Sequence, residues 1–464
     1  MQYYSTRNSN HYVNFRTAAL TGLAQDGGLF VPQEIPEYSD SVRSSLGSMD
    51  FADIAFETIK PYVKNEIPDG ELTDIVRSAF TFPAPIITVA DRYVVELFHG
   101  PTAAFKDFGA RFMARAFSYL RRGEDKPLKI LVATSGDTGG AVADGFYEVP
   151  GISVTVLYPK GRVTPIQERQ IAGLAGQGKN ISALAVEGSF DDCQRLVKAA
   201  LADEDLNKRI SLSSANSINI SRLIPQIVYY SAAAGKAFAG RIDEDKEATP
   251  RVRKAKGLKR LNISKWETFP KLQGKPITLC VPSGNFGNLT AGLYAMKMGA
   301  PIVQFIAATN INKTIPDYLD SGNYLAQISQ VTLSNAMDVG APSNFERMSA
   351  HFSWEEMKRI ILGVYVTDEE TKNTIKRIYD DAGYYLDPHS AVGWEGMDKL
   401  CRINKIPYGP MGLLCTAHPA KFFETVEPLI GSPPVPASLS SAMKRTVNAK
   451  TIPADIKALL EELW

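Results

Sequence analysis

The sequence is poor in cysteine, nearly free of net charge and without any apolar run of membrane-spanning length. Its four cysteines stand far apart without a CxxC pair, so they predict no disulfide framework and no metal site. Cys280 and Cys415 lie in apolar, strand-like runs and are predicted to be buried free thiols, which fits a reducing, cytoplasmic location. With 51 basic against 50 acidic residues, the composition gives no reason to expect a nucleic-acid or membrane partner.

The remaining composition is typical of a globular protein. Of the 464 residues, 44% are hydrophobic and 22% charged, a length that suits two large domains or three average ones. Apolar strand-like runs alternate with glycine turns and amphipathic helices, which predicts an α/β fold with a mostly parallel sheet covered by helices. We expect a mostly helical N-terminal region over 1–90, an α/β domain over 91–235 and a second over 236–464.

One lysine, Lys106, lies between an apolar run and a predicted helix in residues 97–113, LFHGPTAAFKDFGARFM. Asp107 is expected in the first turn of that helix, where a negative charge suits the helix dipole. Apolar surroundings disfavour a charged amine, which lowers the pKa of a lysine and makes it a nucleophile or a Schiff-base partner. A surface lysine at a helix start is the simpler alternative, and for a single lysine it is the commoner one.

A glycine-rich turn, PSGNFGN at 282–288, follows a buried-type strand and precedes a helix rich in Ala and Leu. Two glycines allow a sharp turn with inward N–H groups, and a helix N-terminus adds partial positive charge. Such a turn can bind an anion without a lysine. It lacks the GK[ST] of a P-loop and the spacing of GxGxxG. An ordinary turn between a strand and a helix is equally compatible with these residues.

Small polar residues follow two other predicted strands. Residues 134–140, TSGDTGG, come after the strand at 129–134, and their hydroxyls and backbone amides suit a carboxylate such as that of an amino acid. Asp137 could equally be an ordinary helix cap. Thr416 follows the strand at 411–415, where a threonine is usually a cap or a turn residue. Ligands of parallel sheets bind at the carboxyl ends of strands, which is where both groups are expected.

A further polar group consists of Asn216 and Ser217 with Arg222, near the start of a predicted helix. Charge-assisted bonds from such residues can hold a phosphate. The alternative is a capped helix with a surface arginine. Two histidines, His389 and His418, fit either a place near the site or a structural role.

The stretch 240–275 interrupts the alternation of strands and helices. It is highly charged, weakly apolar and rich in Lys and Arg, which favours a solvated surface insertion. A nucleic-acid patch is the alternative. Adjacent acidic residues and the lack of interleaved aromatics argue against it.

Six motifs, taken in order, give the chain a clear resemblance. It resembles the longer branch of the threonine synthase family, found in many bacteria and fungi, from about residue 1 to about residue 430, with YYSTR…DGGLFVP as an N-terminal match. The motifs are HGPTAAFKDFGARFMAR, ATSGDTGGAVA, SSANSINISRL, VPSGNFGNLTAG, LSNAMDVGAPSN and TAHPAKF.

The resemblance implies a pyridoxal 5'-phosphate (PLP) enzyme of the tryptophan-synthase-β class. That class has two doubly wound α/β domains with the cofactor in the cleft between them. Lys106 would form the Schiff base, and Thr416 would face the pyridine nitrogen. Asp137 would stand where related enzymes have asparagine beside the phenolic oxygen, so its hydrogen-bond role is an open question. The cofactor phosphate would bind to Gly284, Asn285, Phe286, Gly287 and Asn288. Ser135 and Thr138 would take the substrate carboxylate, and Asn216, Ser217 and Arg222 the substrate phosphate.

The resemblance further implies conversion of O-phospho-L-homoserine and water to L-threonine and phosphate, by a monomer or homodimer. Three alternatives are weighed against it. A serine or threonine dehydratase on the same scaffold is opposed by the phosphate group at 216–222. A non-catalytic PLP-binding homologue is opposed by Lys106 together with the cofactor loop. A nucleotide-binding protein is opposed by the missing P-loop lysine.

Overall fold

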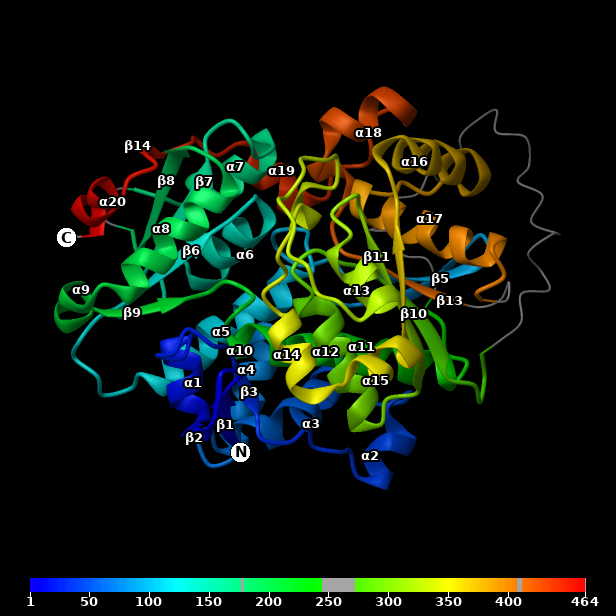
Figure 1. Cartoon of the computed structure of the whole chain (residues 1–464), viewed down its shortest axis with the longest axis horizontal. Helices are drawn as coiled ribbons and strands as arrows, with labels where there is room; N and C mark the ends of the chain where they lie inside the picture. Colours follow the sequence, from blue (N-terminus) through cyan, green and yellow to red (C-terminus); the bar gives the residue numbers. More distant parts are fainter. Residues whose placement is uncertain (177–178, 244–271, 407–410, 464) are drawn as a thin grey trace.

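The computed structural model describes residues 1–176, 179–243, 272–406 and 411–463. Two mostly parallel sheets covered by helices lie on either side of a cleft, with the N-terminal elements below both of them in the view of Figure 1. The predicted α/β fold with mostly parallel sheets is therefore confirmed. Most of the predicted charged insertion, 244–271, lies outside the described residues. Within the described part of the chain, no helix has the length and apolarity needed to cross a membrane.

The larger sheet has six strands and is parallel except at one edge, where β4 runs antiparallel to β5. Its central strands are fully buried, as expected for strands covered on both faces. The order across the sheet is β12 (Ile361–Tyr365), β11 (Ile302–Thr309), β10 (Ile277–Pro282), β13 (Met411–Cys415), β5 (Arg92–Glu96) and β4 (Ile86–Val89). Because β5, β10 and β13 are parallel, their carboxyl ends lie at one edge.

The smaller sheet has five strands, and every pair in it is parallel. Its order is β14 (Lys450–Pro453), β8 (Ile181–Glu187), β7 (Ile152–Pro159), β6 (Leu128–Ala133) and β9 (Ser211–Ser214). The adjacent strands β6 and β9 lead into the 134–140 turn and the 215–219 turn, so these two predicted polar groups start side by side.

Helices cover both sheets. The smaller sheet is associated with α5 (Lys106–Leu120), α6 (Asp137–Phe146), α7 (Pro165–Ala172), α8 (Phe190–Ala202), α9 (Glu204–Arg209), α19 (Ala437–Met443) and α20 (Ile456–Leu463). Between or beside the sheets lie α10 (Ile220–Leu223), η1 (Ile224–Gln226), α11 (Ile227–Phe238) and α12 (Gly287–Met298). The larger sheet carries α13 (Thr314–Ser321), η3 (Asn335–Met337), α14 (Phe345–His351), α15 (Trp354–Ile360), α16 (Asp368–Ala382), α17 (Pro388–Arg402), η4 (Pro419–Lys421) and α18 (Phe423–Ile430).

The N-terminal region combines four helices with a small sheet that the sequence did not predict. The helices are α1 (Phe15–Thr21), α2 (Asp40–Ser45), α3 (Phe51–Val63) and α4 (Asp69–Ala79). The antiparallel sheet has the order β2 (Asn8–Asn14), β1 (Gln2–Ser5) and β3 (Phe30–Pro32). Its strands are short, and β2 is almost wholly exposed, so no alternation of apolar residues marks it in the sequence.

The sheets do not follow the predicted division at residues 91 and 236. Strand β5, assigned to 91–235, pairs with β13 in the larger sheet. Strand β14, assigned to 236–464, pairs with β8 in the smaller sheet, and α20 then packs on α8. The chain therefore crosses between the two sheets, and strand pairing between distant segments decides membership rather than position along the sequence.

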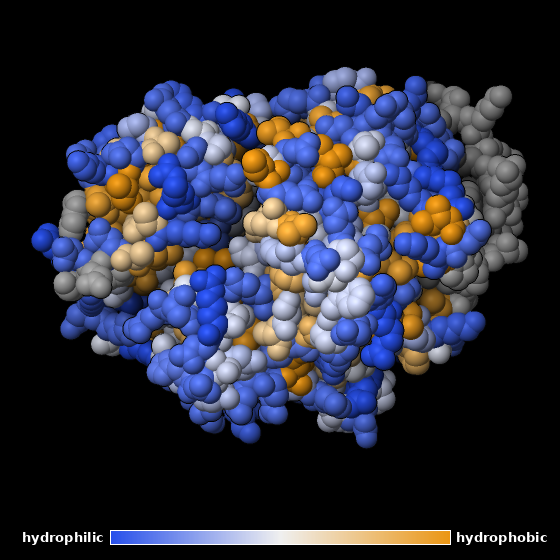
Figure 2. All heavy atoms as spheres, viewed as in Figure 1, coloured by the Kyte–Doolittle hydropathy of each residue, from blue (hydrophilic) through white to orange (hydrophobic). Residues whose placement is uncertain are grey.

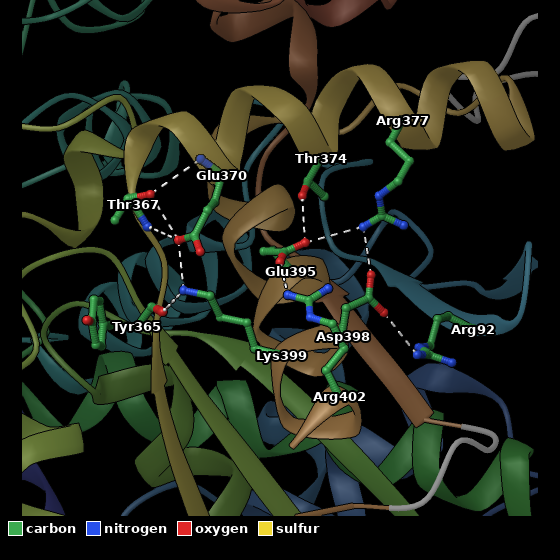
Figure 3. Close-up of polar contacts among 10 residues, drawn as sticks. All are labelled: Arg92, Tyr365, Thr367, Glu370, Thr374, Arg377, Glu395, Asp398, Lys399 and Arg402. Atoms are coloured by element: carbon green, nitrogen blue, oxygen red, sulfur yellow. Dashed lines mark hydrogen bonds and ion pairs between the residues drawn. The ribbon is translucent and has the colours of Figure 1, made fainter. Parts of the chain in front are cut away.

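A network of charged side chains joins α16, α17 and β5 on the outer side of the larger sheet (Figure 3). Glu395 accepts a hydrogen bond from Thr374 at 3.0 Å and lies between the guanidinium groups of Arg377 and Arg402. Asp398 pairs with Arg377 at 2.7 Å and with the buried Arg92 at 3.2 Å. Arg92 opens β5, so the network fixes α17 to the strand that leads toward Lys106.

The C-terminal segment, β14 and α20, packs on β8 and α8, so we expect it to stabilise the smaller sheet. Leu459 of α20 is fully buried with Leu196 and Cys193 of α8. We expect Leu459→Ala to lower the free energy of unfolding by about 2–5 kcal/mol, because it removes buried methyl groups and leaves a cavity. Hydrogen exchange should accelerate in β8 and α8 before it does so in β10 and β13.

The exposed neighbour Lys457 provides the control, and Lys457→Ala should change stability by less than about 0.5 kcal/mol. If Leu459→Ala left the hydrogen-exchange protection of β8 unchanged, this result would contradict a stabilising role for β14 and α20.

Candidate active site

The carboxyl ends of strands from both sheets open on one cavity. In Figure 2 a hollow separates the lobe that carries α8 from the centre of this face. Phe190, Gln194 and Lys198 of α8 line the cavity. Every site residue predicted from the sequence lines this cavity: Lys106, Ser135, Asp137, Thr138, Asn216, Ser217, Arg222, Gly284, Asn285, Phe286, Gly287, Asn288 and Thr416. The predicted convergence of distant loops is thus observed.

Lys106 begins α5 and borders the cavity, with Nζ 5.3 Å from the centre of the Phe105 ring. Desolvation lowers the pKa of its amine to about 8, and the cations of Lys421 and Arg222 act in the same direction, while Asp137 opposes them. The sequence prediction of a desolvated lysine at the start of a helix is borne out by this environment. A substantial fraction of this amine is neutral near physiological pH.

Asp107 lies in the first turn of α5, as predicted, but its carboxylate is fully buried and bonded. It accepts hydrogen bonds from the Thr102 backbone N–H at 2.9 Å and from the Thr102 hydroxyl at 2.6 Å. Burial raises the pKa of Asp107 to about 6 despite these bonds. Its role is therefore to hold the 102–107 turn in shape, beyond the expected interaction with the helix dipole.

Asp137 begins α6 and carries a buried carboxylate with two identified donors. Lys421 Nζ lies 2.8 Å from Oδ1, and the Gln167 amide donates to the same oxygen at 2.9 Å. Burial alone would raise the pKa of Asp137, but Lys421 and then Lys106 outweigh burial and hold it well below its ordinary value. Asp137 is therefore a paired anion in the cavity wall. Gly136 occupies the N-cap position of α6, so Asp137 is not the helix cap.

The turn at 283–288 has the geometry of an anion cradle. Phe286 takes a left-handed backbone conformation with φ of +60°, and α12 begins at the next residue. A Cβ on Gly284 would lie 2.7 Å from the Met337 Cα and 2.8 Å from the Ala336 carbonyl oxygen, so only glycine lets the turn pack against η3. Residues 282–288 line the cavity at the N-terminus of α12, a position where backbone N–H groups commonly bind anions.

Asn288 is oriented by two tyrosines from α11. Its Oδ1 accepts hydrogen bonds from the Tyr229 hydroxyl at 2.6 Å and the Tyr230 hydroxyl at 2.7 Å. The other end of this amide, Nδ2, is buried and has no partner in the described structure. An unsatisfied buried donor costs free energy, and the cavity is lined by this same residue. Asn288 therefore presents a donor that a bound anion would satisfy.

Arg222 is buried against α5 rather than exposed at the surface. Its Nη1 donates to the Ala215 carbonyl, while Nε is buried without a partner in the described structure. Gly109 of the AFKDFG motif permits this packing, since a Cβ there would approach Arg222 Nε to 2.8 Å. Burial lowers the pKa of Arg222 to about 10, so the side chain remains a cation facing the cavity. The alternative of a surface arginine is excluded.

Asn216 and Ser217 lie beside Arg222 but differ in what they offer to a ligand. The Asn216 amide donates to the Ala133 carbonyl at 2.6 Å and accepts from the Ala133 N–H at 3.2 Å, which fixes the turn after β9 to the end of β6. The Ser217 hydroxyl accepts from Asn285 Nδ2 at 2.6 Å and keeps its own proton for another acceptor. Ser217 thus connects the Arg222 region with the 283–288 turn.

The two histidines left open by the sequence have different environments. His389 of α17 lines the cavity, and its Nε2 accepts from the Ala336 N–H at 3.2 Å while Nδ1 contacts Asp387 at 2.7 Å. His418 is not among the described residues that line the cavity. Its Nδ1 accepts from the Ala420 N–H at 3.1 Å, and burial lowers its pKa to about 3. His418 is therefore a structural histidine.

Three contributors to the site were not singled out from the sequence. Lys421 lies in the TAHPAKF motif, where a lysine in an apolar run resembles the Lys106 signal. Gln167 comes from the capping box of α7 and carries no recognisable signal. The segment 335–339 lines the cavity within the LSNAMDVGAPSN motif and leaves Asn335 Oδ1 buried without a partner in the described structure.

The residues that line the cavity fit the chemistry of pyridoxal 5'-phosphate. An amine with a lowered pKa lies on one wall, and a backbone anion cradle with an unpartnered amide donor lies on another. Thr416, which carries a neutral hydroxyl, also lines the cavity and follows β13, the strand between β10 and β5 in the larger sheet. A molecule with an aldehyde, an aromatic ring and a phosphate ester uses each of these groups.

Comparison with known proteins agrees with this chemistry. Family models described as "Threonine synthase N terminus", "Pyridoxal-phosphate dependent enzyme" and "Threonine synthase, C-terminal" match residues 2–80, 89–237 and 390–461. Threonine synthase of Escherichia coli is 39% identical over 461 residues, covering 99% of this chain and 98% of the relative.

Solved structures give the same result. The crystal structure of threonine synthase from Escherichia coli superimposes with a TM-score of 0.84, covering 100% of this chain and 99% of that one. The PLP-bound threonine synthase of Brucella melitensis has a TM-score of 0.83 at 34% identity, covering 100% and 98%. With such identity along nearly its whole length and threonine synthase models at both ends, the chain belongs to the threonine synthase family of pyridoxal-phosphate-dependent enzymes.

Proposed function

We propose that this chain converts O-phospho-L-homoserine and water to L-threonine and phosphate, with the residue roles given below. One observation carries the proposal. A single cavity joins the Lys106 amine, the anion cradle at 283–288 and the buried cation of Arg222. A phosphorylated amino acid bound through PLP needs an amine and two separate anion sites, which distinguishes it from the substrate of a dehydratase.

In this proposal the residues Gly284, Asn285, Phe286, Gly287 and Asn288 hold the PLP phosphate, and Lys106 holds its aldehyde carbon. Thr416 faces the pyridine nitrogen, where a neutral hydroxyl leaves that nitrogen less protonated than a carboxylate would. The cofactor supplies an electron sink for charge developing at the substrate carbons. Support comes from the unpartnered Asn288 Nδ2 and from the lowered pKa of Lys106.

The chain's own residues then bind the substrate and move protons. Lys106 removes protons from the substrate Cα and Cβ, which allows phosphate to leave from Cγ. Protons then return at Cγ and Cα while water supplies the hydroxyl at Cβ, and a pKa of about 8 suits Lys106 to these transfers because both protonation states are accessible. Ser135 and Thr138, at the start of α6, take the substrate carboxylate. Ser217 and Arg222 bind the substrate phosphate directly, and Asn216 contributes mainly by fixing their turn to β6.

We also propose a cytoplasmic location and a monomeric or homodimeric state. The location is supported by the four cysteines, each of which is buried and free. The oligomeric state is the one that the family resemblance implies, and size-exclusion chromatography with light scattering tests it.

The first test of the proposed function is removal of the amine. Lys106→Ala should abolish both the visible absorbance of the PLP-loaded protein and phosphate release from O-phospho-L-homoserine, since it removes the amine assigned to the aldehyde carbon. Absorbance spectra and a phosphate assay measure the two effects. The exposed lysine in Lys358→Ala serves as the control and should leave both unchanged. Normal turnover in Lys106→Ala would contradict the assignment.

The second test concerns the substrate phosphate. Arg222→Gln should raise KM for O-phospho-L-homoserine about 10- to 100-fold, because a hydrogen bond to a charged group contributes about 1.5–3 kcal/mol. Inhibition by inorganic phosphate should weaken in parallel, while the PLP absorbance is retained. Arg377→Gln, which removes a guanidinium from the remote α16–α17 network, is the matched control (Figure 3).

A wild-type KM in Arg222→Gln would remove this residue from the substrate site. A further assay distinguishes the proposed function from that of a serine or threonine dehydratase. When the wild-type protein is incubated with L-threonine, we expect no formation of a 2-oxo acid. A high rate with L-threonine and none with O-phospho-L-homoserine would replace the proposed function.

A further inference from the structure

A second buried lysine, Lys421, stands behind the wall of the cavity and has no role in the proposed chemistry so far. Its side chain is fully shielded from solvent. The ammonium lies 2.8 Å from Asp137 Oδ1 and donates to the Thr102 carbonyl at 2.9 Å. A lysine is almost never buried this completely unless its charge is paired, so this position is costly without Asp137.

Lys421 is held in place by the backbone around it. The segment 416–421 runs beside 103–105, with the Phe105 N–H donating to the Thr416 carbonyl at 2.8 Å and the His418 N–H donating to the Ala103 carbonyl at 3.0 Å. The Thr102 carbonyl also accepts from Gln170 at 3.0 Å. Lys421 therefore connects the turn that carries Lys106 with the first residue of α6.

The charges that face Lys106 come from three other elements. Asp137 of α6 favours the protonated amine, whereas Lys421 of η4 and Arg222 of α10 favour the neutral amine. Asp137 in turn faces Lys421, Lys106 and His389 of α17. On α5 itself, the Asp107 carboxylate is engaged by Thr102. Without Lys421, only the weaker effect of Arg222 would offset the Asp137 carboxylate at Lys106.

We propose that Lys421 is a positioning residue of the active site: its ammonium fixes the Asp137 carboxylate against the Thr102 turn and cancels the charge of that carboxylate at Lys106. The proposal rests on the assignment of Lys106 as the cofactor-binding amine. The proposal also explains how Asp137 can stand at a position where related enzymes have a neutral asparagine. Asp137 with Lys421 behind it forms a pair without net charge, which is electrostatically closer to a neutral amide than a bare carboxylate is.

If Lys421 cancels the charge of Asp137, substitutions of these two residues should shift the pKa of Lys106 in opposite directions. Lys421→Met keeps the length of the side chain and removes the charge, so the apparent pKa of the Lys106 nitrogen should rise by about 1 or more. Asp137→Asn should lower it. The double variant Asp137→Asn with Lys421→Met should return close to the wild-type value, because both charges are absent. Lys421→Arg, which keeps the charge, should stay near wild type.

Two readouts measure this pKa in the full-length protein. The first is the pH titration of the visible absorbance of the PLP-loaded protein. The second, which needs no cofactor, is the pH dependence of Lys106 acylation by acetic anhydride, followed by peptide mass spectrometry. In the unloaded wild-type protein we expect the midpoint near 8.

The matched control is Lys399, whose ammonium also contacts one carboxylate and one carbonyl, Glu370 at 2.7 Å and Tyr365 at 2.9 Å (Figure 3). This pair lies on the α16–α17 side, so Lys399→Met should leave both Lys106 profiles unchanged. A Lys421→Met profile that coincides with wild type, or a double variant that keeps the shift of Lys421→Met, would overturn the proposal.

If Lys421→Met alone does not fold, the proposal is still tested by three other variants: Asp137→Asn, Lys421→Arg and the double variant. The proposal fails if Asp137→Asn does not lower the midpoint, or if the double variant departs from wild type. A different result would show that the proposed function itself is wrong. In that case wild-type protein shows no PLP absorbance that depends on Lys106, whatever the state of Lys421.

Discussion

The structure depends on parallel pairing between strands that are distant in the sequence. Strand β5 reaches the larger sheet by pairing with β13, and this pairing sets the Lys106 turn beside Thr416. Because the paired strands are parallel, the turns that follow them emerge at the same edge and can share one cavity. Each catalytic or binding group therefore owes its position to backbone hydrogen bonds made by residues outside the cavity.

Within that cavity, electrostatics follow from burial. Desolvation lowers the pKa of Lys106 and Arg222 and would raise that of Asp137, but the Asp137 carboxylate is held as an anion by Lys421. Polar atoms without partners in the described structure, Arg222 Nε and Asn288 Nδ2, belong to residues that face the same space. A buried polar atom without a partner costs free energy, so these side chains lower the stability of the unliganded protein.

Much of this arrangement could be predicted from the sequence. The apolar runs at 129–134 and 277–281 are strands, and the turns after them line the cavity as expected. Position along the chain predicted the wrong sheet for strands whose pairing partners are distant in the sequence, such as β5 and β14. Strand β14 joins the smaller sheet because β8 offers a free parallel edge, and nothing in KTIP indicates that partner. Likewise Asn216 was predicted as a ligand group, whereas its amide largely serves the backbone of β6.

By itself, the sequence determined which residues bear the chemistry: a lysine in apolar surroundings, a glycine turn before a helix, and hydroxyl and arginine side chains near helix starts. These signals are local, since each depends on neighbours within a few residues. Only the tertiary structure decided that Lys421 would compensate Asp137 and that Tyr229 and Tyr230 would orient Asn288. Those interactions arise from contacts across the fold, and a buried charge acquires its partner only when the chain has packed around it.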